Sequence, residues 1–161
     1  MADKFHLPID DMLDLAAALG RLLVHWSFLE VMLIQLTAYI LTVDVYKAQF
    51  IYREFISTRS KISLLRKIND KCAPDASVKE NIEKYLEKAL KLNKKRNDIV
   101  HAFWVVSEDT LGMVNTSPHN KGNGIPIKVT PKHIQNVVEE IASLSRSLLL
   151  LLFPNAKVPT K

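Results

Sequence analysis

The residues of this chain whose types and spacing suit chemistry lie together in the segment NKKRNDIVH, residues 93–101. Asn93, Asn97 and His101 follow one another at four-residue spacing, so on a helix they form one polar line. An imidazole can take up or release a proton near neutral pH, and the two amides can hold a polar ligand beside it. A single histidine on a helix is more commonly structural. The line is therefore compatible with a ligand site and with a purely structural role.

Three cations precede the histidine. Lys94, Lys95 and Arg96 would give this end of the helix a phosphate-binding character. Arg96 also occupies a place in an apolar series that advances by alternating steps of four and three: Val78, Ile82, Tyr85, Ala89, Leu92, Ile99 and Phe103. A guanidinium in that series needs an anionic or dipolar partner, for which Glu30 and a ligand both qualify. A salt-bridged or snorkelling arginine without a function is the more common arrangement.

Long helices are expected to position this segment, because only four glycines occur and prolines are widely spaced. The four expected helices run from after Pro8 to about Thr42, over about 44–70 with or without a kink, from about 77 to past 100, and from Thr130-Pro131 onward. Asp10 or Asp11 would stabilise the start of the first helix. Thr130 followed by Pro131 is a capping residue with proline at the first helical position. The apolar residues after it repeat at helical spacing and predict a buried stripe: Ile134, Val137, Ile141, Leu144, Leu148 and Leu151.

The segment between the last two helices has a different pattern. FWVV (103–106) and LGMV (111–114) flank the polar SEDT, which predicts a short hairpin, and NKGNG after it is typical of a loop. The predicted fold class is all-α, an up-and-down bundle of four to five helices with a small β-hairpin excursion before the last helix. With 161 residues, a single domain over 1–161 is expected.

Charge is distributed unevenly along the chain, whose net charge is +5. Residues 1–46 carry 2 basic and 6 acidic side chains, whereas residues 47–101 carry 14 basic and 7 acidic ones. A basic middle would attract a polyanion such as RNA, although solvated helix faces have the same composition.

Residues 22–43 are apolar enough and long enough to span a bilayer. Glu30 near the centre, with His25 and Gln35, argues against a membrane span, so no membrane partner is expected. The segment is instead predicted to be the central helix of a bundle, or one that also buries a face against a second subunit. Glu30 would then be buried and need a cationic or hydrogen-bonding partner.

No cofactor or metal is expected. Cys72 is the only cysteine, which excludes an intrachain disulfide and favours a reducing, cytoplasmic location. GNG at 122–124 lacks the companion lysine or glycine of a phosphate-binding loop. The remaining histidines lack the spacing of metal ligands: His6, His25, His119 and His133. Aromatic residues near the basic segment could stack nucleic-acid bases, although helical spacing makes them better core candidates: Tyr52, Phe55 and Tyr85.

The run from Arg96 to His101 resembles the R-x(4 to 6)-H motif of the HEPN superfamily, including its preferred polar residue, here Asn97, directly after the arginine. The motif lies late in the penultimate long helix of an all-helical chain of suitable size, after a first helix containing WSFLE. The resemblance covers the whole chain. It implies a small helical bundle that often dimerises and that in many members is a metal-independent endoribonuclease.

The resemblance further implies that His101 is the catalytic acid/base, that Arg96 contacts the scissile phosphate and that Asn97 orients the site. RNA carries its own nucleophile, the 2′-hydroxyl, so proton transfer and charge stabilisation are sufficient for cleavage. One chain supplies one motif histidine, and a two-fold homodimer would supply the second. Asn93, Lys94 and Lys95 are the expected RNA-binding residues.

Two classes of function follow. The first is an RNA endonuclease, such as a toxin or host-defence effector, whose partners would be RNA and an antitoxin or regulatory protein. The second is a non-catalytic module that binds RNA, a nucleotide or a protein through the same cleft.

Overall fold

The computed structural model describes residues 12–101, 103–107, 110–114 and 129–156, with side chains for 12–101 and 129–156. Within these residues it has five helices and two strands: α1 (Leu13–Leu41), α2 (Val45–Arg53), α3 (Thr58–Cys72), α4 (Ala76–Val100), β1 (Phe103–Ser107), β2 (Thr110–Val114) and α5 (Pro131–Leu152).

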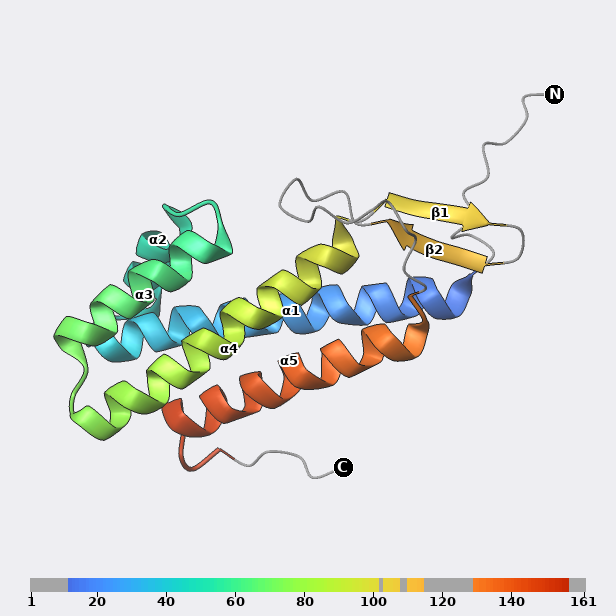
Figure 1. Cartoon of the computed structure of the whole chain (residues 1–161). Coiled ribbons are helices and arrows are strands. Elements are labelled where there is room, and N and C mark those ends of the chain that lie inside the picture. The colour runs from blue at the N-terminus through green and yellow to red at the C-terminus, as the bar shows by residue number, and fades with distance from the viewer. Residues whose placement is uncertain (1–11, 102, 108–109, 115–128, 157–161) are drawn as a thin grey trace.

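The helices form a bundle, which confirms the helical architecture expected from the sequence (Figure 1). The long helices α1, α4 and α5 run along the molecule, with α1 packed most extensively against α5. α3 pairs with α4, and α2 and α3 also contact α1. In Figure 1, α2 and α3 lie at one end of the bundle and the two strands at the other.

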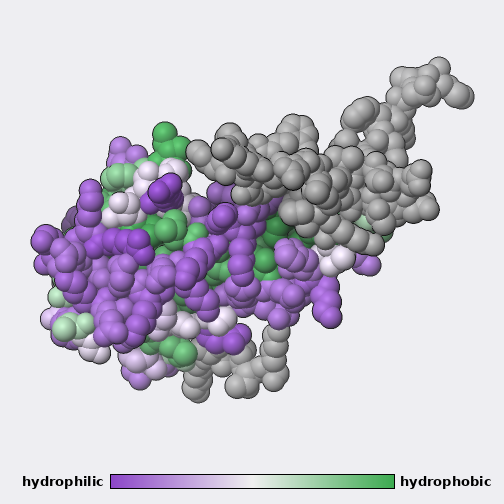
Figure 2. All heavy atoms as spheres, in the orientation of Figure 1, coloured by the Kyte–Doolittle hydropathy of each residue, from purple (hydrophilic) through white to green (hydrophobic). Residues whose placement is uncertain are grey.

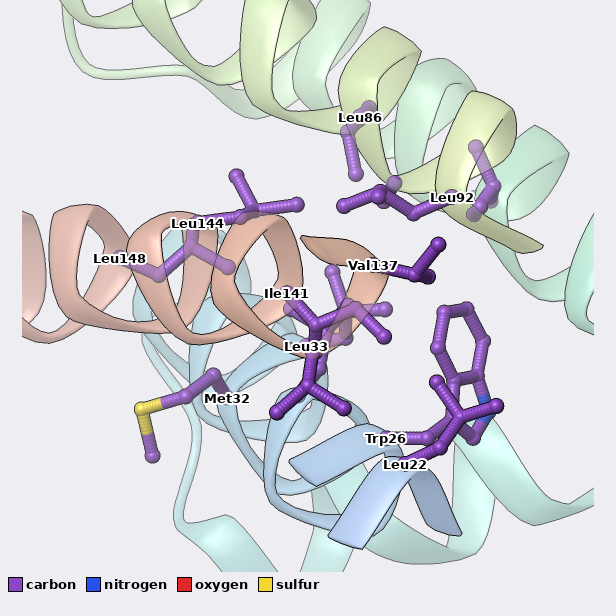
Figure 3. Packing of buried hydrophobic residues seen from close by; sticks show 14 of the residues in the cluster. Leu22, Trp26, Met32, Leu33, Leu86, Leu92, Val137, Ile141, Leu144 and Leu148 are labelled. Atoms are coloured by element: carbon purple, nitrogen blue, oxygen red, sulfur yellow. The ribbon is translucent and has the colours of Figure 1, made fainter. Parts of the chain in front are cut away.

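One hydrophobic core unites the five helices, and it consists mainly of leucine and isoleucine. Figure 3 shows Leu33 of α1 and Ile141 of α5 facing one another, with Leu86 and Leu92 of α4 approaching from the other side. The predicted apolar stripe of the last helix is buried from Ile134 to Leu148. Burying such side chains contributes about 1.5–3 kcal/mol each, so this packing dominates the stability of the bundle.

Side-chain caps explain where the helices begin. Asp44 accepts a hydrogen bond from Lys47 N (3.0 Å) at α2, and Ser57 accepts one from Ser60 N (3.1 Å) at α3. The expectation of one helix over 44–70 is therefore wrong: the chain leaves α2 after Arg53 and starts a new helix at Ser57. A capping serine satisfies backbone donors that a continuous helix would bond internally.

The start of α5 is as predicted, because Thr130 caps it by accepting from His133 N (3.2 Å) and Pro131 occupies its first turn. α1 ends where Thr42 adopts a left-handed conformation with φ of 52°. The expected capping residues Asp10 and Asp11 lie outside the described residues.

α1 is long and apolar enough to cross a membrane by length and composition. In the bundle one of its faces contributes to the core. Glu30 on this helix is half-buried and pairs with Lys61 of α3 (Oε1 to Nζ, 3.6 Å). The carboxylate therefore has the cationic partner expected from the sequence, although it is less buried than predicted.

β1 and β2 pair antiparallel, with Phe103 opposite Val114 and Ser107 opposite Thr110. They cover the segments 103–106 and 111–114 singled out in the sequence. β1 begins just after α4 ends, so the predicted motif lies where the bundle joins the strands (Figure 1).

Candidate nucleic-acid interface

An open groove of about 600 Å³ lies between the start of α3 and the second half of α4. Seven of the described residues line it: Arg59, Leu90, Lys91, Asn93, Lys94, Asn97 and Asp98. Three of the residues predicted to bind or orient RNA, Asn93, Lys94 and Asn97, are therefore brought together on one wall. Figure 2 shows hydrophilic side chains along α4, with a hydrophobic recess between α4 and the α2–α3 end of the molecule.

The turn between α3 and α4 determines which parts of the two helices form the groove. Ala73 to Asp75 reverse the chain, and Asp75 caps α4 by accepting from Val78 N (2.8 Å). Asn69 donates to the Lys79 carbonyl (3.0 Å) across the turn, and Lys79 pairs with Asp70 (2.7 Å). Antiparallel helices joined by a short turn bring the start of the first beside the end of the second.

The groove has a positive balance of charge. Arg59 and Lys94 are exposed, and neither forms an ion pair with another residue in the described ranges. Lys91 is already paired with Glu87 (2.6 Å), whose pKa it lowers by hydrogen bonding and by charge attraction. Among the described lining residues, Asp98 is the acidic side chain. Two available cations beside two amides form a surface suited to the phosphate groups of a polyanion.

Arg96 lies on another side of α4, half-buried against α1. Its guanidinium carbon is 5.9 Å from the ring centroid of the buried Trp26, and Nη1 donates to Asn97 Oδ1 (2.9 Å). Its Nε is buried and makes no hydrogen bond. Of the two partners considered for this arginine, Glu30 is instead paired with Lys61. Asn97 therefore connects Arg96 to the wall of the groove.

Lys95 does not line the groove. Its Nζ lies 2.7 Å from both carboxylate oxygens of Glu140 on α5, so it ties α4 to α5. Its predicted contact with RNA stays a prediction that would require this exposed pair to open.

His101 is the C-terminal cap residue of α4 and is exposed. Its backbone N–H donates to the Asn97 carbonyl (3.0 Å), so the two residues lie one turn apart, about 6 Å along the axis. Residues at this spacing lie on one face of a helix, so His101 follows Asn97 along α4, but it is not among the described residues that line the groove. An accessible imidazole next to a cationic groove can exchange protons with a bound ligand.

Arg59 and Lys91 share the groove with the predicted residues and were not predicted from the sequence. The short turn near Pro74 could have indicated Arg59. Two antiparallel helices joined at that turn place the start of α3 beside the late part of α4. The aromatic candidates are less accessible than base stacking requires: Tyr52 is buried, and Phe55 and Tyr85 are half-buried.

In the described part of the chain, no three histidine, cysteine or carboxylate side chains gather as a metal site. Comparisons with protein-family models, curated proteins and solved structures find no match to this chain.

Proposed function

We propose that this protein is a metal-independent RNA endonuclease of HEPN type, in which the α3/α4 groove binds RNA phosphates and His101 transfers protons at the groove's end. The observation that carries the proposal is the convergence of Arg59 and Lys94 with Asn97, one helical turn before an exposed histidine. The other support is the R-x4-H motif itself, for which the fold provides a late position in a long helix of a bundle.

The proposed reaction needs no external nucleophile. The ribose 2′-oxygen attacks the adjacent phosphorus while a base accepts its proton, and the bond from phosphorus to the 5′-oxygen breaks as that oxygen gains a proton. The products are a 2′,3′-cyclic phosphate and a 5′-hydroxyl. Cationic groups near the phosphate stabilise the negative charge that develops in the transition state.

Two copies of the chain would supply both the base and the acid, because each chain contributes one motif histidine. The proposed homodimer would bring the two His101-bearing ends of α4 together. Exposed apolar side chains on α1, among them Val24 and Phe28, provide additional surface that a partner copy could cover.

The experiment is incubation of labelled single-stranded RNA with the purified protein in excess EDTA, followed by end-group analysis. Cleavage that leaves 2′,3′-cyclic phosphate ends is expected. His101→Gln should abolish it, and Lys84→Met is the matched control because Lys84 is an exposed α4 cation paired with Glu80. Unchanged cleavage by the folded His101 variant would refute the nuclease proposal.

RNA binding by the groove is tested separately by salt dependence. The double variant Arg59→Ala/Lys94→Ala should bind RNA more weakly, and the slope of log affinity against log salt should fall by about 0.7 per lost phosphate contact. A slope equal to that of wild type would remove the groove from the binding site.

A non-catalytic RNA-binding module is the second candidate, and one observation favours it. Arg96 is directed towards Trp26 and does not line the groove, so a bound phosphate would reach it only after a rearrangement. Tight RNA binding without cleavage products would select this alternative.

A further inference from the structure

Two large aromatic rings project from α2 into solvent. Tyr46 and Phe50 are 77% and 73% exposed. They are four residues apart, so their rings lie on one face of the helix. The opposite face of α2 holds the helix to the bundle by burying Ala48 and Tyr52. The exposed pair therefore contributes nothing to the core described above.

The chain connects this aromatic face directly to the cationic groove. Arg53, in the last turn of α2, is exposed, and six residues later Arg59 lines the groove. Between them lies Ile56, which is fully exposed. The α2–α3 connection carries hydrophobic atoms at the surface in Figure 2, beside the recess over α4.

Charge indicates what would cover the aromatic face. From residue 44 to 61 the chain carries 4 basic and 2 acidic side chains. Lys47 pairs with Asp44 (3.0 Å) and Lys61 pairs with Glu30 (3.6 Å), which leaves Arg53 and Arg59 against Glu54. An apolar protein surface docking here would desolvate Arg53 without giving it a partner, which is unfavourable. A nucleic acid presents both bases for the rings and phosphates for the cations.

We propose that Tyr46 and Phe50 form a platform on which unpaired bases of RNA stack, while the backbone of the same strand continues into the groove at Arg59 and Lys94. This inference rests on the proposed function, and it adds the form of RNA that the protein selects. Bases in a duplex are already stacked on one another and cannot reach the rings. The platform therefore favours single-stranded RNA.

The test measures affinity by fluorescence anisotropy for three ligands of about 12 nucleotides: a single strand, the same strand with abasic ribose, and a duplex. Replacing both rings, Tyr46→Ser/Phe50→Ser, should weaken single-strand binding by roughly tenfold or more, because stacking contributes about that factor per base. Binding of the abasic strand should not change. Both rings are exposed, so the double variant should fold normally.

Two controls make the result specific. Phe153→Ser removes a phenylalanine that is 44% exposed at the end of α5, and it should leave every affinity unchanged. Phe50→Trp replaces one ring of the platform by a larger one and should keep or raise the affinity for the single strand.

The possible failures can be told apart. If wild type binds neither RNA single strand nor abasic strand, the proposed function fails. If wild type binds both equally and the double variant changes neither, only the platform is refuted. If the double variant instead lowers the mass of the protein in solution, the rings belong to a protein interface and the platform is likewise refuted.

Discussion

Replacing Arg96 by methionine separates a functional arginine from a structural one. Methionine keeps most of the unbranched length that packs along the helix but removes the charge and every donor. The structure allows the cost for folding to be worked out group by group from the described residues, where the guanidinium lies over the ring of Trp26, donates to the amide of Asn97 and buries an Nε that makes no hydrogen bond.

The opposing contributions nearly cancel. Loss of the cation–π contact costs about 0.5–1 kcal/mol, and loss of the hydrogen bond to Asn97 costs about 0.5–1.5 kcal/mol. Removal of the buried Nε, which makes no hydrogen bond, raises the free energy of unfolding by about 1–3 kcal/mol. The net change in the free energy of unfolding is then within about 2 kcal/mol of zero, or roughly 4–8 °C in Tm for a chain of this size.

The expected effect on activity is much larger. The resemblance to the HEPN motif assigns Arg96 to the scissile phosphate, which it would reach after the rearrangement described above. A lost donor to the developing phosphate charge typically lowers the rate about 100-fold to 1000-fold. Calorimetry would give the Tm, and single-turnover cleavage of labelled RNA would give the rate, with Lys84→Met as the control for a lost α4 cation. A Tm lower by more than about 8 °C, with activity falling only as the folded fraction falls, would show that Arg96 is a structural residue.

Three further predictions concern other parts of the molecule. His101→Gln should abolish cleavage but leave Tm and RNA affinity near those of wild type, because the side chain is exposed at the end of α4. Calorimetry measures the Tm and anisotropy the affinity, and a large fall in Tm would contradict this reasoning. Light scattering at micromolar concentration should give the mass of two chains, and a mass near one chain would count against the shared site. Burial, with a further contribution from the charge of Glu30, raises the pKa of Tyr52. The folded state therefore holds this proton more tightly than the unfolded chain, and stability should fall as pH rises above about 10, the unfolded value. Tyr52→Phe should reduce that loss in denaturant titrations, and equal pH slopes would refute it.

Much of the bundle could be predicted from local sequence, because capping and hydrophobic periodicity are local properties. Thr130 with Pro131 gave the start of α5, and the stripe from Ile134 to Leu148 gave its buried face. The break between α2 and α3 could not be predicted in the same way. No proline or glycine occurs between Asp44 and Asp70, and Ser57 is one of several polar residues there whose capping role depends on how α3 packs.

The candidate site was predictable only on the helix that carries the motif. The four-residue spacing correctly grouped Asn93 with Asn97, because neighbours on a helix face depend on spacing alone. Arg59 reaches the same groove from another helix, which is a matter of tertiary packing. The orientation of the Arg96 side chain could not be predicted for the same reason, because its neighbour Trp26 lies far away in sequence.

The unequal anchoring of α2 and α4 has a consequence for amide hydrogen exchange. The late part of α4 is held to α1 through Arg96 and to α5 through Lys95, whereas α2 is nine residues long and buries only two side chains. Short helices with little burial open at the lowest free energy, so amides of α2 should exchange well before those of α4. An aromatic platform on such a helix can shift relative to a fixed groove. Affinity should then decline gradually, and not abruptly, as the number of nucleotides between stacked base and bound phosphate is varied.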